Sequence, residues 1–344
     1  MKVKLKEICN IEKGKQIDTS KLNDKNAFKY INGGIKESGF YTEYNTDGET
    51  VLVSEGGASC GFVNYVNEKF WCGCHCYKLT NFIKSNPKYI YYVLKGNQEK
   101  IMALRTGAAM PNIKKSTFQD MKVKINDDLD LQQKIVAKLD TIQAAIDNKQ
   151  QQLKELDELV KSRFIEMFGE NPVESGKWNV EKWADKVNIT NGKDYKKLIV
   201  KTGLYPVYGS GGDMGIRVDD YLCTENTVII GRKGNIDKPL FVKEKFWNVD
   251  TAFGLNVNEN EINPYYFFEY CKTYDFRAMD TGVTIPSLTK NALFQLKIAV
   301  PPLSLQNSFA DFVQQIDKSK FVVKQQIKDL QELMDSKMQE YFGE

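Results

Sequence analysis

The chain has 344 residues, of which 42% are hydrophobic and 12% aromatic, which is enough for two ordinary domains with sizeable cores. No stretch approaches the ~18 consecutive apolar residues of a membrane span, so we expect no contact with a membrane. The net charge of +3, from 48 basic and 45 acidic residues, neither requires nor excludes a nucleic acid as partner. A DNA-binding protein with this balance must gather its basic side chains on one face.

The cysteines are odd in number and irregularly spaced, and the first residues lack the apolar run of a signal peptide. We therefore expect reduced thiols and a cytoplasmic protein. The cysteines are Cys9, Cys60, Cys72, Cys74, Cys76, Cys223 and Cys271.

One long segment occurs twice, at 131–170 and again at 305–344. The copies align without a gap at an offset of 174 residues, fourteen of the forty aligned positions are identical, and both end in Phe-Gly-Glu. This offset is close to half of the chain length, so the sequence is a tandem duplication of one globular segment and one helix. We predict globular segments at 1–125 and 171–300, and helices at 126–170 and 301–344. The first long helix is predicted to be capped around 126–128, Asn-Asp-Asp, and to end at 169–172, Gly-Glu-Asn-Pro.

The first globular segment contains short runs that are typical of strands, separated by turns rich in Gly, Asn and Ser. Asn86-Pro87 predicts the start of a helix, because Asn caps helices well and Pro suits the first helical position. This helix is predicted to run through residues 89–104. The runs typical of strands are 28–32, 50–54, 62–66, 70–79 and 121–125.

The same order of motifs recurs from Trp178 onward, at offsets of 175–177 residues. Asn86-Pro87 aligns with Asn263-Pro264, and Met110-Pro111 aligns with Ile285-Pro286. We also align Tyr30 with Tyr205. The duplication therefore covers the globular parts, whose loops have diverged far more than the helices.

Both long helices carry apolar residues in alternating steps of four and three, which is the seam of a coiled coil. Each seam is interrupted by one lysine, Lys149 in the first helix and Lys320 in the second. The two lysines do not occupy equivalent positions when the helices are aligned. This indicates one intramolecular antiparallel coiled coil in which each lysine stem passes an apolar partner. The alternative is two amphipathic helices that each lie on their own domain. The seam residues are Ile135, Leu139, Ile142, Ile146, Lys149, Leu153, Leu156 and Val160, and then Phe309, Val313, Ile316, Lys320, Val323, Ile327, Leu330 and Met334.

Forty helical residues would form a rod of ~60 Å. Two globular domains at opposite ends of such a rod could reach major grooves one to two turns apart on B-DNA, given ~34 Å per turn. The helices would then act as a molecular ruler.

The sequence contains no catalytic constellation that we would defend. It has no GxxxxGK[ST] loop, and Gly209-Ser-Gly-Gly212 lacks the strand and helix context of a nucleotide or methyl-donor cofactor site. His75 is the only histidine. These observations argue against an enzyme.

Two motifs resemble chemical sites but have simpler interpretations. Asn86-Pro-Lys-Tyr89 and Asn263-Pro-Tyr-Tyr266 resemble the Asn-Pro-Pro-Tyr motif of amino-methyltransferases without its second proline, so we interpret both as helix caps. The cluster 72–76, Cys-Gly-Cys-His-Cys, lacks a distant second pair of ligands. We therefore predict a buried strand with small thiols there, and no metal.

The candidates for contact with DNA lie in glycine-containing loops, where the backbone approaches closely and polar side chains can contact phosphates or base edges. Each loop taken singly also fits an ordinary turn. Their recurrence at equivalent places favours a binding role, and Arg232-Lys233 at the place of Glu55-Gly56 indicates that the two halves read different things. The candidates are Lys13, Lys15, Asn32, Gly33, Gly34, Gly56, Gly57, Arg105 and Met110 in the first half, and Asn191, Lys193, Tyr195, Tyr208, Ser210, Gly211, Gly212, Arg232, Lys233, Asn235 and Thr284 in the second.

The whole chain resembles the specificity (S) subunit of type I restriction–modification enzymes. The resemblance rests on two divergent domains with similar long helices, and on the motifs at 209–212, 229–235, 281–290 (with a weaker copy at 106–115) and 301–306. At 126–128 the first half has Asn-Asp-Asp where the second has Pro301-Pro302 at its helix entry, which we interpret as drift.

The resemblance implies an α+β fold with two target-recognition domains in tandem, joined by an antiparallel coiled coil with pseudo-twofold symmetry. It implies a non-catalytic subunit that reads a bipartite, asymmetric target in double-stranded DNA and docks two modification (adenine methyltransferase) subunits. Restriction subunits that translocate and cleave DNA are expected to join them. No cofactor is expected on this chain, and S-adenosylmethionine, ATP and Mg²⁺ are expected on the partner subunits.

Two other interpretations remain open at this point. One is a self-contained, type II-like DNA methyltransferase with duplicated recognition domains, against which the missing cofactor motif argues. The other is a coiled-coil scaffold with two protein-binding heads, which would protect no DNA in a footprint.

Overall fold

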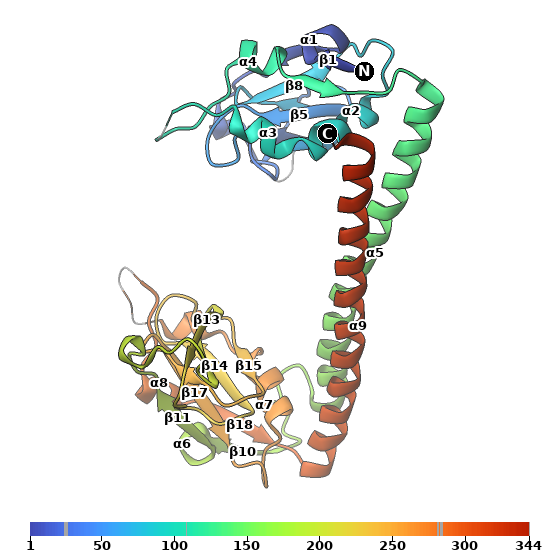
Figure 1. Ribbon diagram of the computed structural model, residues 1–344. Coiled ribbons are helices and arrows are strands. Elements are labelled where there is room, and N and C mark those ends of the chain that lie inside the picture. Colours follow the sequence, from blue (N-terminus) through green and yellow to red (C-terminus); the bar gives the residue numbers. More distant parts are fainter. Residues whose placement is uncertain (24–26, 108, 281, 283–284, 344) are drawn as a thin grey trace. The chain divides into compact units, whose positions relative to one another are not determined.

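The computed structural model describes residues 1–23, 27–107, 109–280, 282 and 285–343 (Figure 1). The chain divides into two compact units, Met1–Gln150 with Gln325–Glu344, and Gln151–Lys324. Two long helices, α5 (Leu129–Phe168) and α9 (Leu303–Phe342), each contribute to both units. The part of each unit outside these helices is called head 1 in the first unit and head 2 in the second. Among the described residues, no helix is long and apolar enough to cross a membrane.

Head 1 contains a four-stranded antiparallel sheet in the order β2-β8-β5-β6, a three-stranded sheet β4-β3-β7 in which β3 and β7 run parallel, and the antiparallel pair β1-β9. Its strands are β1 (Lys2–Lys4), β2 (Asn10–Lys13), β3 (Phe28–Ile31), β4 (Phe40–Tyr41), β5 (Thr50–Ser54), β6 (Val63–Val66), β7 (Phe70–Cys72), β8 (Cys76–Thr80) and β9 (Lys122–Lys124). Its helices are α1 (Leu5–Ile8), η1 (Thr19–Lys21), α2 (Pro87–Gly96), α3 (Gln98–Ala103) and α4 (Lys115–Gln119).

Head 2 repeats this topology with the sheets β11-β17-β14-β15 and β13-β12-β16 and the pair β10-β18. Its strands are β10 (Asn179–Lys182), β11 (Val187–Asn191), β12 (Tyr205–Gly209), β13 (Gly212–Val218), β14 (Thr227–Gly231), β15 (Leu240–Val242), β16 (Trp247–Asn248), β17 (Ala252–Val257) and β18 (Lys297–Val300). Its helices are α6 (Trp183–Lys186), η2 (Lys196–Leu198), α7 (Pro264–Cys271), η3 (Phe276–Met279) and α8 (Lys290–Phe294). The mixed α+β fold with two domains in tandem is as predicted.

The parallel strand pairs fix which residues of the two heads are equivalent. Tyr30 pairs with Trp71 in head 1, and Val207 pairs with Trp247 in head 2. The equivalent of Tyr30 is therefore Val207, and the predicted alignment of Tyr30 with Tyr205 is wrong by two residues.

The strands β5 and β14 form the centre of each head and are buried at every residue. A central strand covered on both faces has no solvent side, so its sequence is a continuous run of β-branched and other apolar residues. In head 1, α2 packs on this sheet through Tyr89, Ile90 and Val93.

The predicted helix starts are confirmed in both heads. Asn86 accepts hydrogen bonds from the backbone N–H groups of Lys88 and Tyr89, and Asn263 accepts one from Tyr265. These are helix N-caps followed by proline at the first helical position.

The single helix predicted over 89–104 is wrong, because α2 ends at Gly96 and α3 begins at Gln98. Asn97 between them has φ −106° and ψ 17°, and its side-chain amide donates to the carbonyl of Val93 at 2.8 Å. A side chain that bonds its own backbone in this way competes with the helical ladder.

The single strand predicted over 70–79 is also wrong. Strand β7 ends at Cys72 and β8 begins at Cys76 in a different sheet, with a turn between them. Both of these thiols are buried, whereas Cys74 in the turn is partly exposed. The seven cysteines are free thiols, and among the described residues no group of three or more His, Cys, Asp or Glu could hold a metal ion.

The predicted caps of α5 are also confirmed. At its start, Asp128 accepts hydrogen bonds from the N–H groups of Asp130 and Leu131 at 2.9 and 3.2 Å. At its end, Gly169 follows the last helical residue with a φ of +98°, the left-handed conformation in which glycine commonly ends a helix.

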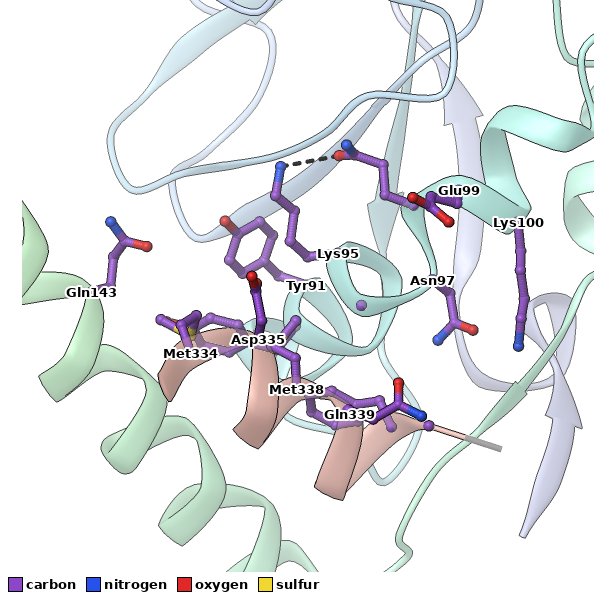
Figure 2. A pocket seen from close by; sticks show the side chains of 15 residues that line it. Tyr91, Lys95, Asn97, Glu99, Lys100, Gln143, Met334, Asp335, Met338 and Gln339 are labelled. Carbon is purple, nitrogen blue, oxygen red and sulfur yellow. Dashed lines mark hydrogen bonds between the residues drawn. The ribbon is translucent and has the colours of Figure 1, made fainter. Parts of the chain in front are cut away.

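In the first unit the start of α5 and the end of α9 belong to the core of head 1. Phe342 makes an edge-on contact with Tyr89 of α2 at 5.6 Å between ring centroids, and a Cβ at Gly96 would meet Met338 and Phe342. Beside this contact lies a surface hollow of about 650 Å³, where Figure 2 shows Met334 and Met338 of α9 near Tyr91 of α2.

In the second unit the end of α5 packs on the start of α9. Phe164 and Phe168 each contact Phe309 at 5.5–5.6 Å between ring centroids, and both contact Tyr266 of head 2. The two helices are therefore antiparallel, as predicted. All predicted seam residues are buried or half-buried.

The lysine at the seam of α9, Lys320, is half-buried, with its charged end paired at the edge of the seam. Its ammonium group forms an ion pair of 2.6 Å with Asp157 of α5. The stem covers apolar surface while the charge reaches a partner at the rim.

Candidate nucleic-acid interface

The first loop of the candidate interface follows β2 in head 1 and contains Gly14 and Lys15. Their backbone N–H groups donate to the carbonyls of Cys76 and Cys72 at 3.1 and 2.9 Å. The indole N–H of Trp71 donates to the carbonyl of Lys15 at 2.9 Å. A Cβ at Gly14 would lie 2.2 Å from the carbonyl oxygen of Gly73, so only glycine allows this close approach.

Head 2 builds the same turn after β11. Gly192 and Lys193 donate to the carbonyls of Ala252 and Asn248 at 3.2 and 2.9 Å, and Trp247 donates to the carbonyl of Lys193 at 3.0 Å. A Cβ at Gly192 would lie 1.7 Å from a backbone oxygen of Val249. Each head therefore holds one lysine, Lys15 or Lys193, at the same point of the fold.

A second loop follows the central strand of head 1 and is held by three backbone hydrogen bonds. The N–H of Glu55 donates to His75 at 2.8 Å, its carbonyl accepts from Ile113 at 2.8 Å, and the N–H of Gly57 donates to Pro111 at 3.0 Å. These three bonds are called the loop clamp.

Head 2 has the same loop clamp after β14. The N–H of Arg232 donates to Thr251 at 2.8 Å, its carbonyl accepts from Leu288 at 2.9 Å, and the N–H of Gly234 donates to Pro286 at 2.9 Å. Glu55 and Arg232 are therefore equivalent residues on one backbone geometry, with opposite charges.

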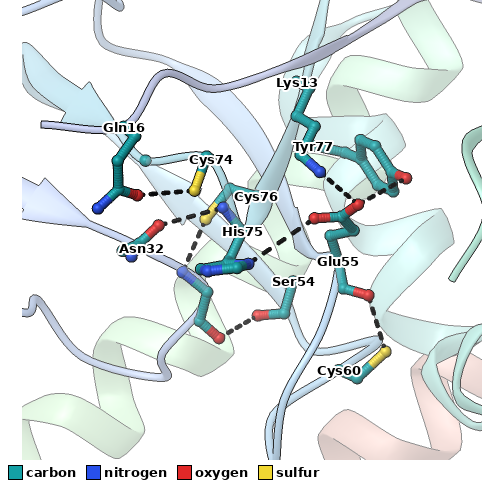
Figure 3. Close-up of polar contacts among 12 residues, drawn as sticks. Lys13, Gln16, Asn32, Ser54, Glu55, Cys60, Cys74, His75, Cys76 and Tyr77 are labelled. Carbon is teal, nitrogen blue, oxygen red and sulfur yellow. Dashed lines mark hydrogen bonds and ion pairs between the residues drawn. The ribbon is translucent and has the colours of Figure 1, made fainter. Parts of the chain in front are cut away.

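In head 1 this loop borders a hollow of about 540 Å³, called hollow 1, and Figure 3 shows the polar contacts around it. The Glu55 side chain is 14% exposed, and its Oε1 accepts a 2.6 Å ion pair from Lys13. Its Oε2 lies 3.9 Å from Nδ1 of His75, which is too far for a hydrogen bond. The carboxylate is thus held in place through one oxygen.

Tyr77 lies beside this carboxylate. Its hydroxyl lies 2.9 Å from the carbonyl of Ile113 and 3.4 Å from Oε1 of Glu55, so its single proton goes to the carbonyl. Burial, with the charge of Glu55 as the next cause, raises the pKa of Tyr77 to about 12.

Asn32 and Gly33 of head 1 line hollow 1, but their polar groups are engaged within the loops. The side-chain oxygen of Asn32 accepts from the N–H of His75 at 3.1 Å. Gly33 is buried with a φ of +87°, and its carbonyl accepts from the hydroxyls of Ser54 and Ser59. Gly34, beside them, lines hollow 1.

The structure brings most of the other predicted residues of head 1 together. Lys13, Gly56, Gly57 and Met110 all line hollow 1, and Met110 is 79% exposed. Arg105 is not among the lining residues; its Nε is buried and has no hydrogen-bond partner among the described residues.

In head 2 a hollow of about 660 Å³, called hollow 2, lies at the glycine loop between β12 and β13. It contains four of the predicted residues together with three carboxylates that the sequence analysis missed. Its lining includes Tyr195, Ser210, Gly211 and Gly212, and the acids Asp194, Asp213 and Asp250.

One of these acids is held by a cation. Asp213 forms an ion pair of 3.2 Å with Arg217 and accepts a hydrogen bond from the N–H of Gly215 at 2.8 Å. Burial opposes its ionisation, but these two partners outweigh burial and lower the pKa of Asp213.

The remaining predicted residues of head 2 lie outside the lining of hollow 2. Asn191, Arg232, Lys233 and Asn235 are exposed, whereas the Tyr208 ring packs edge-on against Phe246. Thr284 lies outside the described residues.

Glu55 is not among the predicted contact residues, although its loop is predicted to face DNA. A signal was present, because Glu55 directly follows the fully buried strand 50–54 and stands where the second copy has Arg232.

Comparison with known proteins gives consistent results. The family model of the type I restriction modification DNA specificity domain matches residues 1–158 and 175–332. A Mycoplasma genitalium protein described as a type I specificity subunit is 23% identical over 354 aligned positions, which cover 97% of this chain and 91% of that protein. A Mycoplasma pneumoniae protein with the same description is 26% identical over 217 positions, covering 59% of this chain and 57% of that protein.

Solved structures share the fold. The crystal structure of the type I restriction–modification system S subunit from M. genitalium has a TM-score of 0.66 at 21% identity, and the match covers 100% of this chain and 96% of that one. A chain from a study of complex assembly and conformational transition of the type I R-M system has a TM-score of 0.56 at 11% identity, covering 99% and 97%.

Two heads of one fold, with equivalent loops that differ in sequence, define an internally duplicated two-domain protein. The chain belongs to the type I restriction–modification DNA specificity family, because the family model matches both halves. It is a non-catalytic DNA-recognition subunit that acts with DNA and with other subunits of a restriction–modification complex, and the predicted family is confirmed.

Proposed function

We propose that head 1 and head 2 each read one half of a bipartite, asymmetric target in double-stranded DNA. The observation that carries this proposal is the loop clamp, which is the same in both heads but presents Glu55 in one and Arg232 in the other. A common backbone places the loops alike on the duplex, while different side chains select different bases.

The proposed contacts divide by chemistry. Lysines suit phosphates, and polar or apolar side chains on the loop tips suit base edges in the major groove. Asn32, Gly33 and Tyr208 have a supporting role in this scheme, because their polar groups or rings are engaged within their own heads. The proposed contact residues are Lys13, Lys15, Gly34, Gly56, Gly57 and Met110 of head 1, and Asn191, Lys193, Tyr195, Ser210, Gly211, Gly212, Arg232, Lys233 and Asn235 of head 2.

The long helices are proposed to set the gap between the two half-sites. α5 and α9 are each continuous over 40 residues, which corresponds to ~60 Å at 1.5 Å per residue. Apolar residues at the seam, rather than flexible loops, hold these helices together, so the spacing they impose would be fixed.

The same helices are proposed to dock two modification subunits, which would bind S-adenosylmethionine, and restriction subunits, which would use ATP and Mg²⁺. Phe321 and Val322 of α9 support a docking role, because they are adjacent and 72% and 53% exposed. Large apolar side chains that are left in water on a helix are typical of a protein interface.

Footprinting of the chain assembled with its partner subunits tests the proposal. Two protected half-sites with an unprotected or sequence-independent gap are expected on one duplex. Replacing segment 175–300 by a second copy of segment 1–125 should preserve binding and turn the asymmetric target into two inverted copies of the half-site read by head 1. Protection of no DNA, or of one continuous site that the replacement leaves unchanged, would contradict the proposal.

The docking surface has a separate test. Replacing Phe321 and Val322 together by serine should abolish co-purification of the modification subunit, because it removes the exposed apolar side chains. The double replacement of Gln325 and Gln326 by serine, also on the exposed part of α9, is the matched control and should leave co-purification intact. Equal recovery of the modification subunit with both variants would exclude this surface.

A further inference from the structure

The residue directly after the central strand has the same backbone environment in both heads. In each head its N–H and its carbonyl are fixed by the loop clamp, with lengths of 2.8 and 2.8 Å at Glu55 and of 2.8 and 2.9 Å at Arg232. The next position pairs across the same gap, since Gly56 bridges to Asn112 and Lys233 bridges to Ser287. The two side chains therefore leave equivalent backbones at equivalent places.

We infer that this position selects one base pair in each half-site, and that Glu55 selects cytosine while Arg232 selects guanine. The inference rests on the proposed function, because it requires that both heads face the major groove. Glu55 and Arg232 would then determine the specificity of head 1 and head 2 at this base pair.

Glu55 is built to accept hydrogen bonds. An ionised carboxylate has no proton to donate, and the Lys13 ion pair at 2.6 Å holds one of its oxygens while the other lies beyond hydrogen-bond reach of His75. A charge in this position repels phosphates unless it is compensated, and Lys13 supplies that compensation in advance.

Among the bases, cytosine fits this acceptor best. Guanine presents the acceptors N7 and O6 in the major groove, thymine presents O4, and adenine places the acceptor N7 beside its amino group. Cytosine presents its N4 amino donor without an adjacent acceptor. The carboxylate therefore attracts cytosine and repels the acceptors of the other bases, which gives discrimination by both attraction and repulsion.

Arg232 has the opposite chemistry. Its side chain is exposed, its guanidinium lies 5.9 Å from the ring centroid of Phe253, and no ion-pair partner for it occurs in the described part of the chain. A guanidinium has only donors, in a fork that matches O6 and N7 of guanine. The aromatic ring beneath it limits the directions in which the fork can point.

Selection from a library of random-sequence DNA duplexes by the assembled complex tests the inference. The native complex should enrich a cytosine at one position of the half-site read by head 1, and a guanine at one position of the half-site read by head 2. Glu55→Gln should reduce the cytosine preference about 5- to 150-fold, with a gain for adenine because an amide both donates and accepts. Arg232→Gln should reduce the guanine preference by a similar factor.

The half-site of the unchanged head is the internal control in each variant, and Glu99→Gln on α3 is the matched control for loss of a carboxylate. Enrichment of the same base by the native and Glu55→Gln complexes, or loss of the whole half-site with an unchanged melting temperature, would overturn the assignment. If the native complex enriches no bipartite sequence, the proposed function itself fails. The two failures are therefore distinguishable.

Discussion

At the scale of single residues, two loops have the same backbone hydrogen bonds in both heads, but only one of them carries the same side chain. Glu55 and Arg232 occupy one loop clamp, and Lys15 and Lys193 occupy one glycine turn. The lysines are the same in both heads, as expected for contacts with phosphates, which carry no sequence information. The side chains after the central strand are opposite in charge, as expected for contacts with bases.

Lys13 provides a test at this scale. Lys13→Met should weaken DNA binding for every sequence, because the partly buried carboxylate of Glu55 would then face the phosphates without its cation. We expect a loss of about tenfold, by the cost of leaving a charged group without its hydrogen-bonded partner. Fluorescence anisotropy of labelled duplexes at a fixed salt concentration measures it.

Lys29→Met is the control for this variant, since Lys29 pairs with the exposed Glu68 elsewhere in head 1. Equal affinities of the two variants would show that Lys13 does not compensate Glu55 during binding. A loss confined to one base position would instead mark Lys13 as a base contact.

At the scale of elements, the first turn of each long helix is hydrogen-bonded to its head through one buried glutamine. Gln132 and Gln306 are fully buried, at 0% exposure, and lie in the first turns of α5 and α9. Gln132 accepts from the N–H of Asn86 at 2.8 Å and donates to the carbonyl of Asn126 at 2.7 Å. Gln306 accepts from the N–H of Asn263 at 2.9 Å and donates to the carbonyl of Pro301 at 2.8 Å.

Gln132→Ala should lower the free energy of unfolding by about 2–4 kcal/mol, because it leaves a half-buried N–H and a half-buried carbonyl without partners and opens a cavity. Chemical denaturation monitored by circular dichroism measures this loss. Gln133→Ala, one residue further along and exposed, should change the stability by less than about 0.5 kcal/mol. A similar small effect of both substitutions would show that the buried glutamine does not fasten the helix.

The sequence was most informative about elements governed by local rules. The duplication, the helix caps at Asn86, Asp128 and Asn263, and the apolar seam follow from residues close together in the chain, and the structure confirms them. The two buried glutamines were not predicted, although they align at the offset of 174 residues, because glutamine at the start of a helix is ordinarily solvated.

Strand boundaries and strand register could not be predicted, because they depend on tertiary contacts. The pattern 70–79 has the composition of one strand, but the turn at 73–75 is stabilised by Asn32, which directly follows β3, some forty residues earlier in the chain. Likewise the equivalence of Tyr30 and Val207 depends on strand register. Of the candidate site, the loops could be named in advance, but the carboxylates that line them could not, because their neighbours come from distant segments.

At the scale of the whole molecule, we propose that the heads recognise the DNA and that the helices set the spacing. A family match over both halves establishes the DNA-recognition subunit, and the bipartite target and the helical ruler are our proposals. If the helices set the gap, a change in their length should alter the gap without altering either half-site. Substitutions in the loops of one head should alter that head's half-site and leave the gap unchanged.

The most direct test is to insert one heptad into α5 after Gln150 and one into α9 after Lys324, which preserves the apolar seam. Seven residues add ~10 Å of helix, or at most about three base pairs at ~3.4 Å each. Sequences of the duplexes bound by the native and extended complexes give both half-sites and the gap. The account predicts the same two half-sites with a longer gap; an unchanged gap, or altered half-sites, would contradict it.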